Sequence, residues 1–410
     1  MPIDASRPLA VDLFAGAGGL SLGLEQAGYE VAAAVEYDPV HAAVHEFNFP
    51  QGKTFCADVS KISGAEIRKR SEIGDREIHL VAGGPPCQGI SMIGRRLVDD
   101  PRNALLKEFV RIVLELKPRY FLMENVAGLM VGPHRQLLDE VVESFETSGQ
   151  YDVVTPVRVL QAADYGTPQS RRRTILVGAR KDVALPKYPE PTHTPRTIRG
   201  SVPKNPALPL GASVSDALGD LPDADLFEDL LHDDNVAGVA YGKTNEYAAR
   251  LRGSKKDPTD FSRPRPRIED EMTSSARTVH TKKSIDRFAG AEPGTTETVS
   301  RFLRLHPDGL CNTLRAGTAT DRGAIPAGGQ EPLNCRAQHP ADELDPETIT
   351  MFIDEPDHLG QGRPGSFAKN TLAALRISLA LRSSAFSFCS RLISAAASVV
   401  SPGITPASTS

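Results

Sequence analysis

The chain has 410 residues, of which 40 % are hydrophobic and 24 % charged, and its formal net charge is −5 at pH 7. These totals fit a soluble globular protein of two domains, and the negative charge does not by itself indicate nucleic-acid binding, although a local basic surface is compatible with it. Five widely spaced cysteines without a CxxC pair argue against a zinc knuckle or a disulfide framework, so we expect no metal. No signal peptide or membrane span is apparent, and we expect a cytoplasmic protein with no membrane partner.

Strands and helices alternate from residue 9 to residue 180. Short apolar runs predict strands at residues 9–14, 30–36, 78–82, 119–126 and 174–179. Asp38 is expected to cap the second helix, with Pro39 at its first position. The segments between strands predict helices at residues 20–28, 38–49, 103–117 and 133–149. The alternation is typical of an α/β fold, a doubly wound and mainly parallel Rossmann-like sheet with helices on both faces.

The composition changes near residue 183, where proline, threonine and charge become frequent. It predicts an α/β domain at residues 8–183, a second, irregular domain at 184–325 and an atypical Ser- and Ala-rich tail at 326–410. Within the irregular domain, residues 216–234 hold eight acids and no Lys or Arg, whereas residues 250–287 hold eleven Lys or Arg and six acids. Either run can also be a solvated charged face.

A glycine-rich turn, residues 14–19, follows the first predicted strand, and Glu36 ends the second. Glycines let a ligand approach the backbone, and an acid at that place suits a ribose diol. The turn departs from the dinucleotide pattern GxGxxG at the third glycine. The pair therefore predicts a nucleoside-bearing cofactor, with a tight turn that binds nothing as the alternative.

Cys87 lies in the stretch GGPPCQGIS, residues 83–91, directly after the predicted strand at 78–82. A lone cysteine is usually a buried packing residue. A loop stiffened by two prolines offers little to pack against, and it suits a nucleophile held at a strand end. The residues alone leave both interpretations open.

Two further polar groups follow apolar runs. Glu124, in LMENVAGL, is either a helix N-cap or a proton donor. Before the strand at 174–179 stands Gln169-Ser170-Arg171-Arg172-Arg173, and strand alternation places Arg171 and Arg173 on one side. Guanidinium groups there can clamp a phosphate or a carbonyl, or form a solvated edge.

These pieces, in this order, resemble the DNA (cytosine-5)-methyltransferase family. The stretches that carry the resemblance are DLFAGAGGLSLGLEQAGY, VEYD, GGPPCQGIS, ENV and ADYGTPQSRRRTILVG. They span about residues 9 to 180, and a weaker similarity continues from Arg304 to about residue 318. The combination of PPCQ, ENV and QSRRR is highly specific.

The resemblance implies methyl transfer to carbon 5 of a cytosine flipped out of duplex DNA. Cys87 matches the family's nucleophile, which adds to carbon 6 of the ring and makes carbon 5 nucleophilic. Glu124 matches the residue that hydrogen-bonds N3 and the exocyclic amine, and Arg171 and Arg173 match arginines that steady the base carbonyl and the catalytic loop. A base, for which a water is one candidate, then removes the proton from carbon 5.

The resemblance also implies S-adenosyl-L-methionine as the methyl donor. The positions that match the donor site are Asp12, Phe14, Gly16, Gly18, Gly19, Glu36, Tyr37, Asp58, Val59 and Pro86. The positions expected to contact the substrate are Gln88, Ser91, Arg95, Asn125 and Gln169. The loop at 88–102 is expected to close over the flipped base.

Region 184–325 is then expected to recognise the DNA target, with phosphate contacts from residues 250–287. The acidic run 216–234 is expected to face away from DNA or to pack on the catalytic domain. We expect a monomer that works in a restriction–modification system, beside a separate cognate endonuclease. A tRNA cytosine-5 methyltransferase is the alternative of the same architecture, although such enzymes generally have a small recognition domain.

The tail departs from the family pattern. The family usually ends with a helix and a G-N-S/A-V-P segment that returns to the donor, and no such segment follows Arg322. We hypothesise that residues 326–410 are a frameshifted or truncated family C-terminus. This hypothesis predicts weak or absent activity, and at the extreme a catalytically impaired DNA-binding relic.

Overall fold

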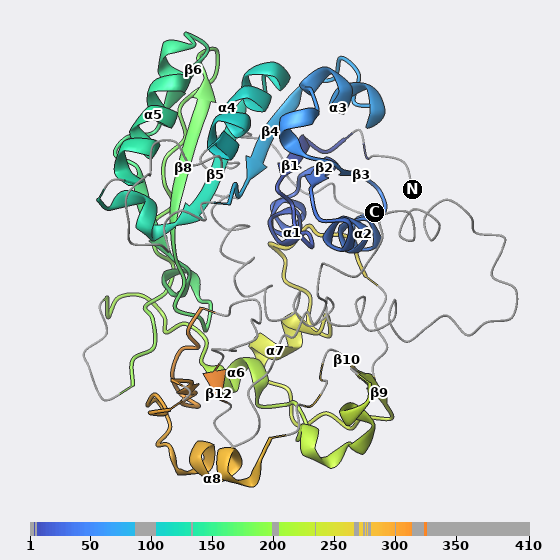
Figure 1. The fold of residues 1–410 in the computed structure, drawn as a ribbon, viewed down its shortest axis with the longest axis vertical. Coiled ribbons are helices and arrows are strands. Elements are labelled where there is room, and N and C mark those ends of the chain that lie inside the picture. Colours follow the sequence, from blue (N-terminus) through green and yellow to red (C-terminus); the bar gives the residue numbers. More distant parts are fainter. Residues whose placement is uncertain are drawn as a thin grey trace, which may run out of the picture.

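The computed structural model describes residues 4, 6–86, 104–132, 134–198, 205–233, 235–265, 270–273, 275, 277, 280–299, 301–313 and 324–325. Figure 1 shows two parts, an α/β sheet with its helices and, below it in the view, an irregular part with α6, α7 and α8. The tail at 326–410 lies outside the described residues.

An eight-stranded sheet forms the first part, with the strand order β3-β2-β1-β4-β5-β8-β6 and β7 paired with β8. The parallel strands are β1 Leu9–Leu13, β2 Glu30–Glu36, β3 Lys53–Cys56, β4 Ile78–Gly83 and β5 Tyr120–Val126. The strands of the antiparallel edge are β6 Tyr151–Val153, β7 Arg158–Gln161 and β8 Arg172–Arg180. The prediction of a doubly wound, mainly parallel sheet is confirmed.

Helices cover both faces of this sheet. Their bounds are α1 Gly19–Gln26, α2 Pro39–Asn48, α3 Gly64–Arg70, α4 Ala104–Leu116 and α5 His134–Thr147. Strand alternation sends Val11 into the cluster with α4 and α5, and Ala10 into a second cluster with α1. Both faces are therefore buried, which explains why the parallel strands read as continuous apolar runs.

In the core, Phe121 of β5 stacks on Phe145 of α5, with ring centroids 3.9 Å apart. A side chain at Gly178 of β8 would place its Cβ 2.3 Å from the Phe121 ring. Only glycine leaves room for this ring, so the packing of α5 on the sheet requires that residue.

The sequence prediction located the long elements and missed the short ones. Asp38 caps α2 as expected, accepting hydrogen bonds from Val40 N and His41 N at 2.9 Å, with Pro39 in the first turn. The elements β3, β6, β7 and α3 were not predicted. Strand β3 buries only Phe55 among its four residues, so it lacks an apolar run.

The irregular part holds short elements, in agreement with the loss of strand–helix rhythm. Its helices are α6 Val214–Leu218, α7 Glu246–Leu251 and α8 Lys282–Gly290. Its strand pairs are β9 Asn235–Ala237 with β10 Glu271–Thr273, and β11 Leu303–Arg304 with β12 Ala324–Ile325. None of the helices in the described ranges has the length and apolar character needed to cross a bilayer.

The irregular part also returns to the sheet. Cys311 N donates to Pro168 O at 2.8 Å, and Ser170 N donates to Cys311 O at 2.7 Å. Thr313 Oγ1 donates to Ser170 O at 2.9 Å. These bonds join the segment at 311–313 to the loop that leads into β8.

Candidate active site

The predicted site residues gather at one edge of the sheet. Gly83, which ends β4, pairs in register with Leu13 of β1 and Met123 of β5. The residues that follow these three therefore lie side by side at the carboxyl ends of the parallel strands, where β5 continues through Glu124 to Val126. Ligands of open α/β sheets bind at this edge.

The turn after β1 favours glycine at position 16 and requires it at position 18. Gly16 has φ +55° and Gly18 has φ +96°, and Phe14 before them is also left-handed at φ +59°. A Cβ at Gly18 would lie 2.1 Å from Cε2 of Phe49 in addition to the strained φ. Gly18 precedes the first turn of α1, so its conformation sets the entry of the chain into that helix.

Glu36 fixes this turn from the end of β2. Its Oε2 accepts a hydrogen bond from Gly16 N at 2.7 Å, and its Oε1 accepts one from Asp38 N at 2.9 Å. A carboxylate has about four acceptor positions. Glu36 can therefore hold the turn and still accept hydroxyl donors from a ligand.

Asp12 is fully buried at the end of β1, in a chain of hydrogen bonds that was not predicted. Ser21 Oγ lies 2.6 Å from Asp12 Oδ2 and 2.9 Å from His45 Nε2, and His45 Nδ1 lies 2.9 Å from Thr54 Oγ1. When Asp12 is ionised and Ser21 donates to it, the consistent arrangement has His45 donating through Nε2 and accepting from Thr54 at Nδ1. The side chain of Asp12 is thus reached from α1, α2 and β3.

Burial dominates the electrostatics of this chain. It raises the pKa of Asp12 to about 7 and lowers the pKa of His45 to about 3. Asp12 Oδ1 is buried and has no hydrogen-bond partner among the described residues. A buried acceptor without a partner is costly, so this oxygen is suited to a ligand donor.

The other predicted donor-site residues lie near the ends of β2, β3 and β4. Tyr37 is 74 % exposed, so its ring face is accessible. Asp58 caps the 3-10 helix Val59–Lys61 by accepting from Ser60 N at 2.9 Å, and its hydrogen bonds to Ser60 lower its pKa. Val59 is buried and Pro86 half-buried.

Glu124 and the two arginines meet at the β5–β8 pairing. Arg173 Nε lies 2.7 Å from Glu124 Oε1, and Arg171 Nη2 lies 3.8 Å from the same oxygen. Arg172 is exposed, as strand alternation predicts. Glu124 lies inside β5 and caps no helix, which excludes the N-cap interpretation.

The loop that leads to Cys87 passes next to Glu124. A Cβ built on Gly84 would lie 3.4 Å from Glu124 Oε2. Asn125 Nδ2 donates to Pro85 O at 3.0 Å, and Asn125 Oδ1 accepts from Val126 N at 2.9 Å. Both polar atoms of Asn125 therefore bind the protein itself and hold the Pro-Pro turn.

Four predicted residues lie outside the described part of the chain: Cys87, Gln88, Ser91 and Arg95. The described loop stops at Pro86, one residue before the thiol. Gln169 is buried beside the segment at 311–313, and its Oε1 has no hydrogen-bond partner among the described residues. No group of three His, Cys, Asp or Glu that could hold a metal ion occurs within the described residues.

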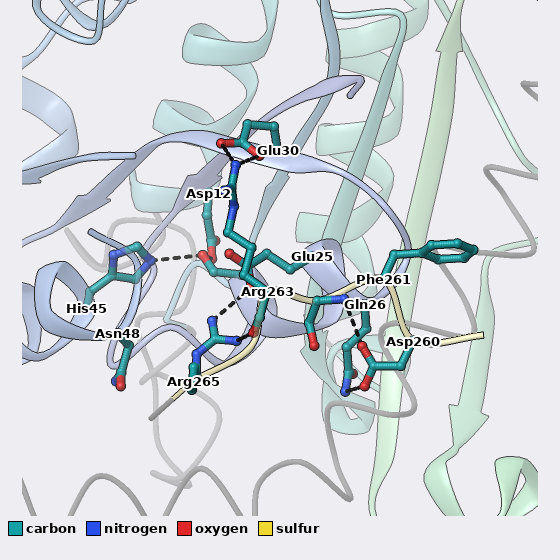
Figure 2. Close-up of polar contacts among 12 residues, drawn as sticks. Asp12, Glu25, Gln26, Glu30, His45, Asn48, Asp260, Phe261, Arg263 and Arg265 are labelled. Carbon is teal, nitrogen blue, oxygen red and sulfur yellow. Dashed lines mark hydrogen bonds and ion pairs between the residues drawn. The ribbon is translucent and has the colours of Figure 1, made fainter. Parts of the chain in front are cut away.

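Charges of the irregular part mostly pair within the protein. Arg252 binds buried Asp220 through Nε and Nη2, the latter at 2.6 Å from Oδ1, and Arg277 lies 2.8 Å from Asp225. The acidic run 216–234 thus faces the basic run 250–287, a contact that the sequence reading did not include. Two more arginines of the basic run, at 263 and 265, reach β2 and α1 of the sheet domain, as Figure 2 shows.

Comparison with known proteins places this geometry in a family. Residues 10–316 match the family model of C-5 cytosine-specific DNA methylase. The type II methyltransferase M.XorII of Xanthomonas oryzae pv. oryzae is 54 % identical over 320 residues, which cover 78 % of this chain and 71 % of that protein. M1.HphI of Haemophilus parahaemolyticus is 42 % identical over 205 residues, covering 49 % of this chain and 54 % of that protein.

A solved structure extends the likeness to the fold. It is described as a DNA modification methyltransferase encoded within a prophage of E. coli, and it matches with a TM-score of 0.55 at 25 % identity, covering 91 % of this chain and 99 % of that one. The resemblance read from the motifs is confirmed by these matches. The chain belongs to the C-5 cytosine-specific DNA methylase family and is a DNA cytosine-5 methyltransferase.

Proposed function

We propose that the chain methylates carbon 5 of a cytosine flipped out of duplex DNA, through a covalent bond between Cys87 and carbon 6. The observation that carries the proposal is the cluster of Glu124 with Arg171 and Arg173, beside the loop that leads to Cys87. Type II enzymes are named among its relatives, so we place it in a restriction–modification system, in the cytoplasm, as a monomer beside a separate endonuclease.

The donor site fits S-adenosylmethionine, which supplies an activated methyl group when bound. Asp12 Oδ1 is a buried acceptor without a partner among the described residues, and it suits the donor's ammonium group. Glu36 accepts the ribose hydroxyls with the positions left by Gly16 N and Asp38 N. Exposed Tyr37 stacks on the adenine, and Asp58 accepts from its amine.

The remaining donor residues shape the pocket. Phe14, Gly16, Gly18 and Gly19 let the backbone of the turn approach the ligand. Val59 and Pro86 supply its apolar walls. We assign these roles on the position of each residue at the carboxyl edge of the sheet.

Chemistry on the base needs a nucleophile and a proton. The Cys87 thiolate adds to carbon 6, and the electron pair displaced toward N3 is met by a proton that Glu124 shares with N3 as the adduct forms. Arg173, 2.7 Å from Glu124, orients this carboxyl and stabilises the negative charge that develops on the ring. Once carbon 5 is methylated, a base takes its proton, the C5–C6 double bond re-forms and the thiolate leaves.

Substrate contacts are assigned to Gln88, Ser91, Arg95, Asn125 and Gln169. Asn125 acts indirectly, because both of its polar atoms hold the Pro85 turn and its neighbour. Region 184–325 recognises the DNA target. Phosphate contacts come from those cations of residues 250–287 that are not paired inside the protein, since the pairs described above already occupy several arginines.

Transfer of labelled methyl groups from S-adenosylmethionine to duplex DNA tests the proposal. We expect incorporation by the full chain, weak because of the atypical tail, none by Cys87→Ala, and none into tRNA. The matched control is Cys311→Ser. The thiol of Cys311 is half-buried, and burial raises its pKa to about 12, so it is a poor nucleophile. The hydrogen bonds of Cys311 to Pro168 and Ser170 use main-chain atoms, so the substitution leaves them in place. Labelling of tRNA alone, or a Cys87→Ala variant as active as the wild type, would overturn the proposal.

Glu124→Gln tests the proton donor separately. The neutral amide keeps the size of the side chain and cannot transfer a proton. We expect the single-turnover rate to fall about 10²- to 10⁴-fold while affinity for DNA is kept. A rate within twofold of the wild type would contradict the role of Glu124.

We further propose that residues 326–410 are a frameshifted or truncated family C-terminus. The family match ends at residue 316, before this segment. Sequencing the locus tests the idea. An alternate frame after about residue 325 that encodes the G-N-S/A-V-P segment supports it, and a conventional uninterrupted frame removes it.

A further inference from the structure

Residues 260–265 belong by sequence to the irregular region, but they lie on the catalytic domain beside α1 and β2 (Figure 2). We call them the docking segment. Phe261 N donates to Gln26 O at 3.1 Å, and Gln26 Nε2 donates to Asp260 Oδ2 at 3.0 Å. Arg7 Nη2 donates to Phe261 O at 2.7 Å from the other side. The segment is thus fixed by main-chain and side-chain bonds to the sheet domain.

Two arginines of the segment neutralise two buried carboxylates of that domain. Arg263 Nη2 lies 2.8 Å from both oxygens of Glu30, and Arg265 Nη2 lies 2.8 Å from Glu25 Oε2. Glu30 is 2 % exposed and Glu25 4 %. A buried carboxylate without its cation is strongly unfavourable, so both pairs require the segment to be in place.

Arg265 also reaches the turn assigned to the methyl donor. Its guanidinium carbon lies 4.8 Å from the ring centroid of Phe49, on the face of the ring. Phe49 is 1 % exposed, and its Cε2 would be 2.1 Å from a Cβ at Gly18. The same ring stacks on His45, with centroids 4.7 Å apart, and His45 belongs to the hydrogen-bond chain of Asp12. One arginine of the irregular region therefore holds the ring against which the donor turn is packed.

We propose that Arg265 is a positioning residue for the methyl donor. It holds Phe49 against Gly18, so that affinity for S-adenosylmethionine depends on a segment of the target-recognition region. The inference rests on the proposed function of the turn at 16–19 as the donor site. It couples the region that binds DNA to the pocket that binds the donor through one side-chain contact.

The test measures donor and DNA binding separately on the full chain. Isothermal titration gives the Kd of S-adenosylmethionine, and fluorescence anisotropy of a labelled duplex gives the Kd of DNA. For Arg265→Ala we expect the donor Kd and the donor KM to rise about tenfold, with kcat at saturating donor within twofold of the wild type. Loss of a contact that only stabilises the fold would not raise the donor KM while leaving kcat unchanged.

The matched control is Arg252→Ala. Arg252 also pairs with a buried carboxylate, Asp220, and lies 4.5 Å over the ring centroid of Tyr241, but both partners belong to the irregular region. We expect its donor Kd to stay within twofold of the wild type. An equal loss of donor affinity in Arg252→Ala would show a general effect of unfolding and would overturn the inference.

Because Arg265→Ala leaves Glu25 buried without its cation, Glu25→Gln/Arg265→Gln is made as well. This pair removes both charges, so we expect the Tm of the wild type together with a weakened donor affinity. Wild-type affinity in this variant overturns the inference. If the wild type itself does not bind the donor, the proposed function is contradicted and the inference falls with it. If the wild type and Arg265→Ala bind the donor with equal affinity, the inference alone is contradicted.

Discussion

The sheet domain and the irregular region, which we propose recognises the DNA target and call the recognition region, are held together by different forces. The sheet domain buries two large apolar clusters, one on each face. The recognition region has small clusters with two or three buried residues each, and arginine–carboxylate pairs join its segments. Apolar burial is insensitive to salt and to most pH changes, whereas ion pairs respond to both.

This difference combines, in one chain, a sheet buried on both faces with a region of short elements joined by ion pairs. A parallel sheet buried on both faces holds the ends of its strands in place, which suits residues that must meet within hydrogen-bond distance. Short elements joined by charge pairs can change sequence without repacking a common core. The four predictions below test this contrast, in order of decreasing effect.

The largest effect is expected from Phe121→Ala in the sheet core. Phe121 is fully buried and stacks on Phe145, so truncation leaves a cavity between β5 and α5 and costs about 3–5 kcal/mol. Urea unfolding followed by circular dichroism measures the loss. Phe288→Ala in the recognition region should reduce stability less, because Phe288 packs in a cluster whose other buried residue is Phe302. An equal loss in both variants would contradict the contrast between the two regions.

Asp12→Asn tests a buried ionisable side chain inside the otherwise apolar core of the sheet domain. Burial raises the pKa of Asp12 from 3.8 to about 7, so its folded form binds a proton more tightly than its unfolded form. Its contribution to stability is complete below about pH 4 and is lost as the pH rises to about 7, a change on the order of 4 kcal/mol.

Asparagine resembles the protonated acid and cannot ionise. Thermal unfolding between pH 4 and pH 8 should therefore show the Tm of the variant increasing relative to the Tm of the wild type as the pH rises. A constant difference across this range would mean that Asp12 does not titrate there.

Arg252→Ala tests the ion pairs of the recognition region. It leaves Asp220, which is 1 % exposed, without its cation, and should destabilise the elements around α6 and α7 by about 3 kcal/mol. Hydrogen exchange resolves this local loss, with amides of the recognition region opening while those of the central strands keep their protection. Loss of protection throughout the sheet would show that the two regions unfold as one unit.

The smallest effect is expected from Asp139→Asn on α5. Arg135 Nε lies 2.8 Å from Asp139 Oδ1, and both side chains are about half exposed. Solvent screens such a pair, which contributes about 0.3 kcal/mol. A loss above 1 kcal/mol in urea unfolding would mean that surface pairs also stabilise the sheet domain.

Sequence patterns predicted the parts of this structure whose causes are local. Apolar runs located the central strands, and an aspartate before a proline located the start of α2. The polar stretches that follow strands located Glu36 and Glu124, because strand ends of a parallel sheet meet at one edge. The alternation of three arginines correctly separated Arg171 and Arg173 from Arg172.

The contacts that escaped prediction depend on residues far apart in the chain. The two docking pairs join positions separated by 233 and 240 residues, and no local pattern relates them. In the sequence, Ser21 and His45 look like ordinary helix residues. Their hydrogen-bond chain with Asp12 forms only when the fold brings their helices next to β1. The acidic run was expected to face away from DNA or to pack on the catalytic domain, yet Asp220 is buried against Arg252, a cation from another segment of the irregular region.

The bond from Gly16 N to Glu36 Oε2 has a consequence for how the donor arrives. The turn is already closed by this bond and by the packing of Phe49, so its backbone entropy is lost during folding and not during binding. A ligand that binds a preformed turn associates without waiting for that turn to order. If this turn binds the methyl donor, as we propose, the donor can bind before any DNA is present, because this part of its site needs no rearrangement.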